Sequence, residues 1–70
     1  MRLVYTLHAR RRLADRAITE DEVEDCILRA DRRGHTKTGN LIYMKAMGGR
    51  VVHVVVAAGS QPPRVITLWD

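Results

Sequence analysis

The stretch Thr6–Ala30, TLHARRRLADRAITEDEVEDCILRA, predicts two helices joined by a tight turn. Thr6 is a suitable N-cap for the first helix, since its hydroxyl can accept a hydrogen bond from an amide of the first turn. Three polar side chains then follow at four-residue steps and form one slanting stripe along the helix: His8, Arg12 and Arg16. Apolar side chains lie on roughly the opposite side and can face a core: Leu7, Leu13, Ala14 and Ala17.

The second helix has a well-defined start. Thr19 and Glu22 have the spacing of a capping box, and Ile18 and Val23 have that of a hydrophobic staple. An apolar face follows at helical spacing: Val23, Cys26, Ile27 and Ala30. We therefore expect a helix from about Glu20 to Ala30.

The second half of the chain predicts an antiparallel sheet. Three runs have strand character, Leu41–Met47, Val51–Ala58 and Arg64–Trp69. A short edge strand around Arg33–Lys37 is compatible with the sequence, and Met1–Tyr5 fits either a short strand or a lead-in to the first helix. Helices followed by such a meander predict an α+β fold. We expect one domain over residues 1–70, with two N-terminal helices packed on one face of a three- to four-stranded antiparallel sheet.

Alternation along the strands divides their side chains between two faces. One set is wholly apolar and is expected beneath the helices: Ile42, Met44, Ala46, Val52, Val54, Val56, Ile66 and Leu68. The other set is mixed and is expected on the open face: Leu41, Tyr43, Lys45, Met47, Val51, His53, Val55, Val65, Thr67 and Trp69. This division needs an odd loop or a bulge near Gly48–Arg50, whereas a two-residue loop would pair Lys45 with Val52. We expect the first arrangement, because a slip of one residue would bury Lys45 or His53.

Composition and charge indicate which partners and which cellular location to expect. The formal net charge is +4, from 12 basic and 8 acidic residues, and a basic surface favours polyanions such as nucleic acid. An arginine-rich solvated surface is the alternative explanation. Cys26 is the only cysteine and lies in the apolar stripe of the second helix, so we expect it in the core, without a disulfide. With no membrane-spanning run and no signal-peptide core, the expected location is cytoplasmic.

The pattern Tyr5-Thr6-x-His8-Ala9-x-x-Arg12-x-x-x-Arg16-x-Ile18-Thr19-x-x-x-Val23 resembles a family of small, uncharacterised bacterial domains with an H-A-x-x-R-x-x-x-R-G-I signature. The similarity continues through Tyr43, the Gly49-Arg50 turn and the closing strand. Such domains look like relatives of RelE- and BrnT-type toxins. The resemblance implies a compact α+β fold, metal-independent RNA cleavage, and RNA and a cognate antitoxin as partners. The family usually has glycine where this chain has Ala17, so either the joint is strained or Ala17 stays helical.

RNA cleavage without metal needs a base for the 2′-hydroxyl, an acid for the leaving 5′ oxygen, and cations for the phosphorane charge. His8 could supply the base, while arginine forks suit phosphate oxygens. The candidate catalytic set is His8, Arg12, Arg16 and His53. The candidate substrate-binding set is Tyr43, Lys45 and Trp69, of which the two aromatic residues could stack on bases. The histidines lack metal-site spacing and no phosphate-binding glycine loop is present, so we expect no metal or cofactor.

Structural roles are the alternative for these residues. His8 could bond a neighbouring loop, and the arginines could pair with Asp15, Glu20 or Asp31. Two functions stay open, and with them whether the protein is an enzyme. The first is a toxin-like endoribonuclease domain of a toxin–antitoxin system. The second is a non-catalytic nucleic-acid- or protein-binding module on the same fold, as a monomer or a homodimer. It would use the apolar part of the open face: Leu41, Met47, Val51, Val55, Val65 and Trp69.

Overall fold

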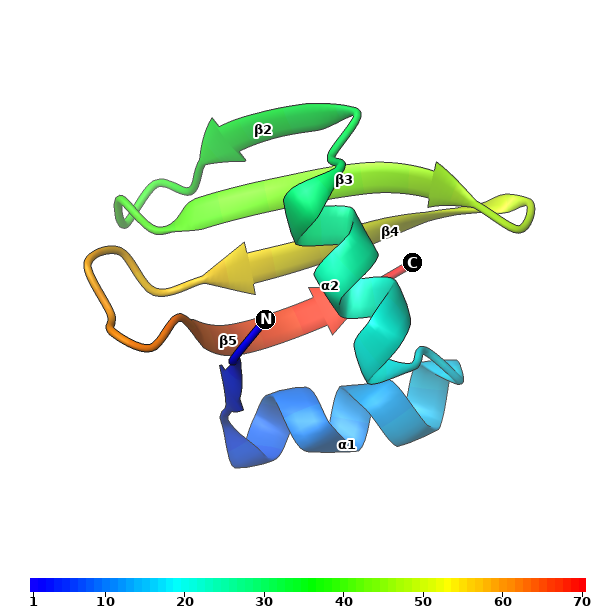
Figure 1. Ribbon diagram of the computed structural model, residues 1–70, viewed down its shortest axis with the longest axis horizontal. Coiled ribbons are helices and arrows are strands. Elements are labelled where there is room, and N and C mark those ends of the chain that lie inside the picture. The colour runs from blue at the N-terminus through cyan, green and yellow to red at the C-terminus, as the bar shows by residue number, and fades with distance from the viewer.

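The computed structural model describes residues 1–70 and consists of two helices and one five-stranded sheet (Figure 1). The elements follow the order β1 (Val4–Tyr5), α1 (Leu7–Arg16), α2 (Glu20–Leu28), β2 (Arg32–His35), β3 (Leu41–Met47), β4 (Arg50–Val56) and β5 (Arg64–Trp69). The spatial order of the strands is β1-β5-β4-β3-β2. The expected α+β class is confirmed. The sheet is mixed and has one strand more than expected, because β1 pairs with β5 in parallel.

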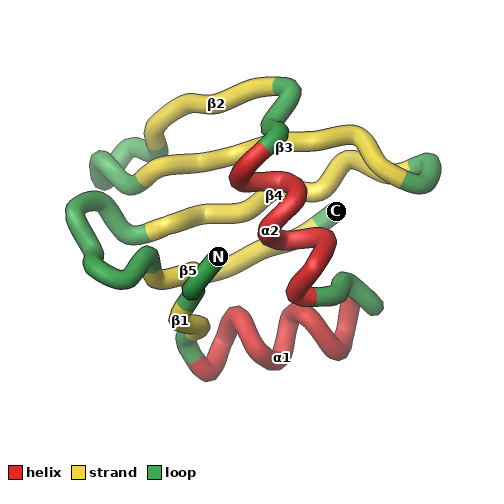
Figure 2. Tube along the Cα trace, in the orientation of Figure 1, coloured by secondary structure: helices red, strands yellow, loops and turns green.

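The two helices occupy different positions around the sheet. The helix α2 crosses the face formed by β3 and β4, whereas α1 lies along the edge at β5 (Figures 1 and 2). The expectation that both helices share one face is therefore wrong for α1. The cause is β1, which brings Thr6 to the sheet edge, where its amide donates to the carbonyl of Val65 at 3.1 Å. Neither helix combines the length and apolar character needed to cross a membrane.

The joint between the helices has the capping that its sequence predicts. The Thr19 hydroxyl accepts from the Glu22 amide at 3.1 Å, and the Glu22 carboxylate accepts from the Thr19 amide at 2.9 Å. The staple residues Ile18 and Val23 are both buried in the core. The helix α2 ends at Leu28, two residues earlier than expected.

The backbone conformation of Ala17 shows which of the two alternatives for the joint between the helices holds. It adopts the left-handed conformation, with φ 51° and ψ 48°, and forms the C-cap of α1. A side chain disfavours this conformation, which glycine adopts freely. The joint is therefore strained at Ala17.

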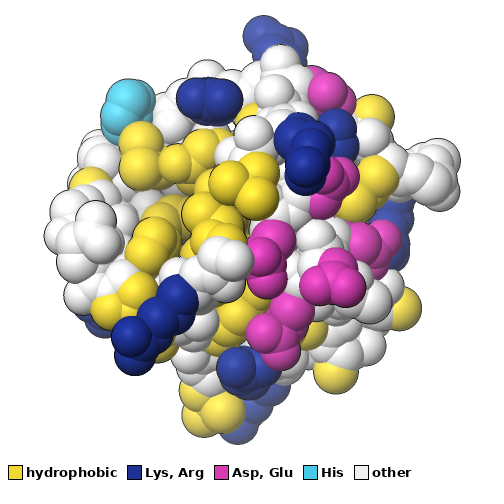
Figure 3. Space-filling view, viewed as in Figure 1, with side chains coloured by type: hydrophobic (Ala, Val, Ile, Leu, Met, Phe, Trp, Pro, Cys, Tyr) yellow, Lys and Arg dark blue, Asp and Glu magenta, His cyan; other side chains and the backbone are white.

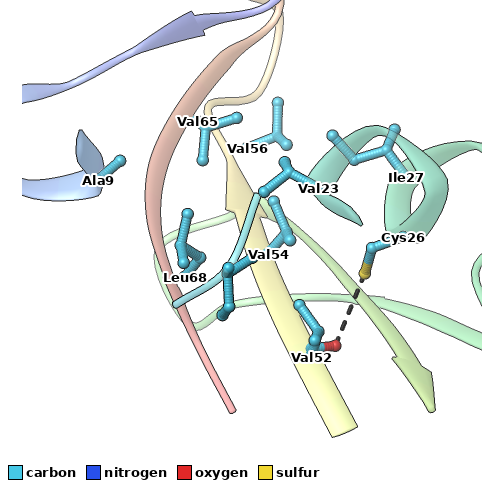
Figure 4. Packing of buried hydrophobic residues seen from close by; sticks show 10 residues of the cluster. Ala9, Val23, Cys26, Ile27, Val52, Val54, Val56, Val65 and Leu68 are labelled. Atoms are coloured by element: carbon cyan, nitrogen blue, oxygen red, sulfur yellow. Dashed lines mark hydrogen bonds between the residues drawn. The ribbon is translucent and has the colours of Figure 1, made fainter. Parts of the chain in front are cut away.

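The core lies between α2, α1 and the helix-facing side of β4 and β5 (Figure 4). Its members are Ala9, Ile18, Val23, Cys26, Ile27, Val52, Val54, Val56, Val65 and Leu68. The Cys26 thiol is fully buried and donates to the carbonyl of Val52 at 3.6 Å. Burial raises the pKa of this thiol to about 11. Cys26 is thus a packing residue, as expected.

The β3–β4 hairpin differs from the expected one. It turns through Gly48-Gly49 alone, and both glycines have positive φ, which suits a tight two-residue hairpin loop. Lys45 therefore pairs with Val52, and the expected odd loop or bulge is wrong. Four residues move to the side facing α2, Leu41, Tyr43, Lys45 and Met47, and three move to the opposite side, Ile42, Met44 and Ala46.

Lys45 tolerates this register because its charge stays near water and polar partners. The ammonium donates to the carbonyl of Arg29 at 3.2 Å and lies 4.0 Å from the Asp31 carboxylate. Both partners lie just after α2, where the helix dipole favours a cation. The aliphatic stem of Lys45 covers the sheet while its head reaches this site, so no charge is buried.

A bulge in β5 completes the division of the faces. Val55 pairs with Thr67 and Val56 pairs with Val65, which leaves Ile66 as the extra residue. Val65 and Leu68 are consequently both fully buried on the helix side, so the expectation that Val65 lies on the open face is wrong. The open face, which carries no helix, consists of Ile42, Met44, Ala46, Val51, His53, Val55, Thr67 and Trp69.

Candidate functional site

The candidate site begins where α1 meets the open face. Thr6 caps α1 by accepting from the Ala9 amide at 3.1 Å and donates its own hydroxyl to the carbonyl of Ile66 at 2.8 Å. The bulge of β5 thus anchors the start of α1. In the first turn of α1, His8 reaches Thr67, and its Nε2 lies 2.9 Å from the Thr67 Oγ1. This bond places an exposed imidazole at the border of the open face.

Arg12 lies one helical turn beyond His8. Its Nε donates to Nε2 of His8 at 3.5 Å, a long hydrogen bond. With the imidazole proton on Nδ1, Nε2 of His8 is the acceptor for both Thr67 and Arg12. A neutral imidazole with its acceptor nitrogen beside a guanidinium suits a proton acceptor that works next to a phosphate.

His53 and Trp69 form the neighbouring part of the site. They are cross-strand partners on β4 and β5, and their rings stack with centroids 4.9 Å apart and planes 5° apart. Nδ1 of His53 is buried without a hydrogen-bond partner. Trp69 follows Thr67 by two residues on the same face, a spacing of roughly 7 Å. Two imidazoles from different elements are thereby brought to one surface.

Arg16 is separated from this cluster. Its guanidinium lies 3.6 Å from the carboxylate of Asp70. Its carboxylate partner is therefore Asp70, and not one of the three acids that the sequence suggested. The polar stripe of α1 is divided, with His8 and Arg12 beside the open face and Arg16 in an ion pair at the end of the helix.

The three predicted substrate-binding residues lie on different faces. Trp69 is on the open face, but the hairpin register turns Tyr43 and Lys45 toward α2. Tyr43 lines a hollow of about 200 Å³ beside α2, where hydrophobic side chains gather on the surface (Figure 3). The thickness of the sheet therefore separates Tyr43 and Lys45 from His8, and the structure does not bring them together.

Arg50 is an organising residue that sequence reasoning missed. Its guanidinium donates to the carbonyls of Arg16 at 2.7 Å and Ala17 at 2.8 Å, and to the carboxylate of Asp70 at 3.0 Å. It therefore closes the C-terminal end of α1 and ties that end to β4 and the C-terminus. The only sequence signal was its position beside the Gly49 turn, since more than 30 residues separate Arg50 from the carbonyls it binds.

The structure contains no group of three or more His, Cys, Asp or Glu side chains that could hold a metal ion. The groups that define the site are instead two imidazoles, one guanidinium, one hydroxyl and one indole: His8, His53, Arg12, Thr67 and Trp69.

These features define a class of protein, a small α+β domain whose uncovered sheet face carries a stacked His53–Trp69 pair, with His8 and Arg12 of α1 at its border. The chain belongs to the family described as Domain of unknown function (DUF4258), whose sequence model matches residues 5–70. The expectation of an uncharacterised-domain family is thereby confirmed. Neither the curated proteins nor the solved structures yielded a match to the chain.

Proposed function

We propose that this chain is a metal-independent endoribonuclease domain that holds RNA on the open face of its sheet. The observation that supports the proposal is the position of His8. It is hydrogen-bonded to Thr67 on the sheet, with Arg12 at its side and the His53–Trp69 stack on the same face. Two imidazoles and a guanidinium are the groups that RNA cleavage through the 2′-hydroxyl requires.

The roles follow from the chemistry of each group. The 2′-hydroxyl replaces the Thr67 hydroxyl as donor to His8 Nε2, which removes its proton, and the 2′ oxygen attacks the adjacent phosphorus. Arg12 stabilises the charge that develops on the phosphorane oxygens. The bond to the 5′ oxygen then breaks as the imidazolium form of His53 donates its Nε2 proton to that oxygen, which leaves His53 neutral. The products are a 2′,3′-cyclic phosphate and a 5′-hydroxyl. Trp69 orients the His53 ring and offers an aromatic surface for a base.

The sequence pattern supports a toxin-like setting for this activity. The run from Tyr5 to Val23 resembles a family of uncharacterised domains that look like relatives of RelE- and BrnT-type toxins, and toxins of that kind are normally held by antitoxin proteins. On this proposal an antitoxin would block RNA from the open face. Arg16, Tyr43 and Lys45 have no part in the proposed reaction, because they lie in an ion pair or on the opposite face.

A second function, binding without catalysis, has an observation in its favour. The two-residue hairpin loop places Ile42, Met44 and Ala46 beside Val51 on a face that no helix covers. Val51 is 47% exposed. Such apolar surface could be buried against a partner protein or a second copy of the chain. This module would bind but leave RNA uncut.

RNA cleavage in EDTA by four proteins tests the proposal: wild type, His8→Ala, Arg12→Ala and Arg11→Ala. Arg11 is the matched control, because it is exposed, lies on the same helix and makes no hydrogen bond or ion pair. We expect His8→Ala to lose about a hundredfold or more in rate, and Arg12→Ala about tenfold or more. Arg11→Ala should stay within about threefold of wild type. A well-folded wild type that binds RNA without cutting it would favour the second function.

A further inference from the structure

The sheet has one free edge, the strand β2. At the other edge the short strand β1 pairs with β5, and α1 lies alongside (Figures 1 and 2). Beyond β2 there is no further element. A free edge presents unpaired backbone N–H and C=O groups, to which an extended chain can add as another strand.

The register shows which backbone groups of β2 are available. The Thr36 amide donates to the carbonyl of Asn40 at 2.8 Å, which makes these two residues a hydrogen-bonded pair. Hydrogen-bonded and non-hydrogen-bonded pairs alternate in an antiparallel ladder. Gly34 therefore bonds to Ile42 on β3, whereas Arg33 and His35 direct their backbone N–H and C=O groups away from the sheet.

The charged side chains at this edge of the sheet are all basic. Residues 32–40 contain three permanent cations and one histidine but no carboxylate: Arg32, Arg33, Lys37 and His35. None of the three cations forms an ion pair. A hollow of about 310 Å³ lies at the same edge, lined by Arg33, Gly34, His35, Leu41, Ile42 and Tyr43. The edge therefore offers a backbone ladder, unpaired cations and room beside them.

We propose that β2 docks an acidic, extended segment of a partner protein, which pairs with the backbone of Arg33 and His35 as a sixth strand. The unpaired cations select carboxylates, and the alternating backbone groups select another polypeptide backbone. A second copy of this chain does not meet these requirements. Antiparallel pairing of two β2 strands about Gly34 would set the basic side chains of one copy against those of the other.

The test uses synthetic eight-residue peptides and amide resonances of the full chain. The probe alternates Val and Glu, and the controls alternate Val and Lys, or Pro and Glu. We expect only the Val–Glu peptide to shift the amide signals of Arg33 and His35 and to slow their hydrogen exchange. The Pro–Glu peptide has the same charge but cannot extend the ladder, so it separates strand addition from simple attraction.

Two matched variants of this chain test the backbone directly. His35→Pro removes an outward N–H without removing a bond to β3, and His35→Ala retains that N–H. We expect His35→Pro to weaken binding of the Val–Glu peptide about fivefold or more relative to His35→Ala. Arg33→Glu should weaken it about tenfold, whereas Arg11→Glu on α1 should leave it unchanged.

Equal affinity of His35→Pro and His35→Ala would overturn the proposal, provided that both variants show the same thermal unfolding. Failure of the Val–Glu peptide to bind at millimolar concentration would overturn it as well, as would preference for the Val–Lys peptide. Protection of the Arg33 and His35 amides by a short single-stranded RNA instead of the acidic peptide would assign the edge to nucleic acid and reject the acidic strand. These outcomes are independent of RNA cleavage, because the proposed nuclease site lies at α1, β4 and β5 and not at β2.

Discussion

His8 and Thr67 are joined by a 2.9 Å hydrogen bond although 59 residues separate them in the chain. The bond connects the first turn of α1 to the open face of β5. Thr6, two residues earlier, binds the carbonyl of the adjacent Ile66. The candidate base and the start of its helix are therefore positioned by the same bulged segment of β5. The proposed activity depends on how firmly α1 is held against that segment.

Loss of the Thr6 hydroxyl should weaken this attachment. Thr6→Ala removes the N-cap of α1 and leaves the Ile66 carbonyl without its side-chain donor. We expect the free energy of unfolding to fall by about 1–2 kcal/mol, measured by urea denaturation. Thr6→Ser keeps the hydroxyl and should remain within about 0.5 kcal/mol of wild type. Equal losses in the two variants would show that the hydroxyl does not hold the helix.

The left-handed Ala17 predicts a stabilising substitution. Ala17→Gly should raise the free energy of unfolding by about 0.5–1 kcal/mol, because glycine adopts φ 51° without a side-chain clash. The control is Ala14→Gly, an exposed position within α1, which should lower it by about 1 kcal/mol. Thermal or urea unfolding of both variants gives the signs. A destabilised Ala17→Gly protein would contradict the described joint.

Arg50 should be important for stability even though it lies outside the candidate site. Arg50→Ala leaves the carbonyls of Arg16 and Ala17 without their donor, and we expect a loss of about 2 kcal/mol. Arg50→Lys should recover only part of it, since an ammonium cannot span two carbonyls as a guanidinium fork does. Arg11→Ala, which removes an arginine without partners, should change stability by less than about 0.5 kcal/mol.

Tyr5 predicts a loss of stability at alkaline pH. Burial raises its pKa from 10.0 to about 12, and the carboxylates of Glu20 and Glu24 act in the same direction against the Arg10 guanidinium. Because the raised pKa belongs to the folded state, the contribution is complete below pH 10.0 and is lost as the pH rises toward about 12. Tyr5→Phe lacks this component, so its unfolding free energy should fall less over that window.

The same substitution has a second expected effect at neutral pH. The Tyr5 hydroxyl is buried without a hydrogen-bond partner, so Tyr5→Phe should be as stable as wild type or more stable by up to about 1 kcal/mol. Cys26, whose pKa is also raised, is present in both proteins and cancels in the comparison. Identical pH profiles from neutral pH to pH 12 would contradict the raised pKa of Tyr5.

The parts of the fold that could be predicted are those encoded by neighbouring residues. The caps at Thr6 and Thr19 and the staple of Ile18 and Val23 are local patterns, and they appear as expected. The register of the β3–β4 hairpin differs from the expected one, although Gly48-Gly49 is itself a local signal for a two-residue loop. The expected bulge rested on the free-energy cost of burying Lys45. Its ammonium avoids that cost because it reaches the end of α2. That contact depends on tertiary structure.

The candidate site was only partly predictable for the same reason. His8 and Arg12 are visible as one helical stripe, and His53 and Trp69 were assigned to the open face by alternation. The His8–Thr67 bond, the bulge at Ile66 and the contacts of Arg50 join segments that are far apart in sequence. No local pattern encodes them. The separation of Tyr43 and Lys45 from the site follows from the register of the β3–β4 hairpin, which was not the expected one.

The most direct test of the proposed reaction is the chemistry of the RNA ends that the purified chain produces in EDTA. The substrate is an RNA oligonucleotide, and the comparison is the same oligonucleotide with 2′-deoxy residues at the positions that are cut. We predict 2′,3′-cyclic phosphate and 5′-hydroxyl ends from the RNA, no cutting at the deoxy positions, and loss of both products in His8→Ala. Fragments with 5′-phosphate ends, or cutting that persists without the 2′-hydroxyl or without His8, would contradict the proposed reaction.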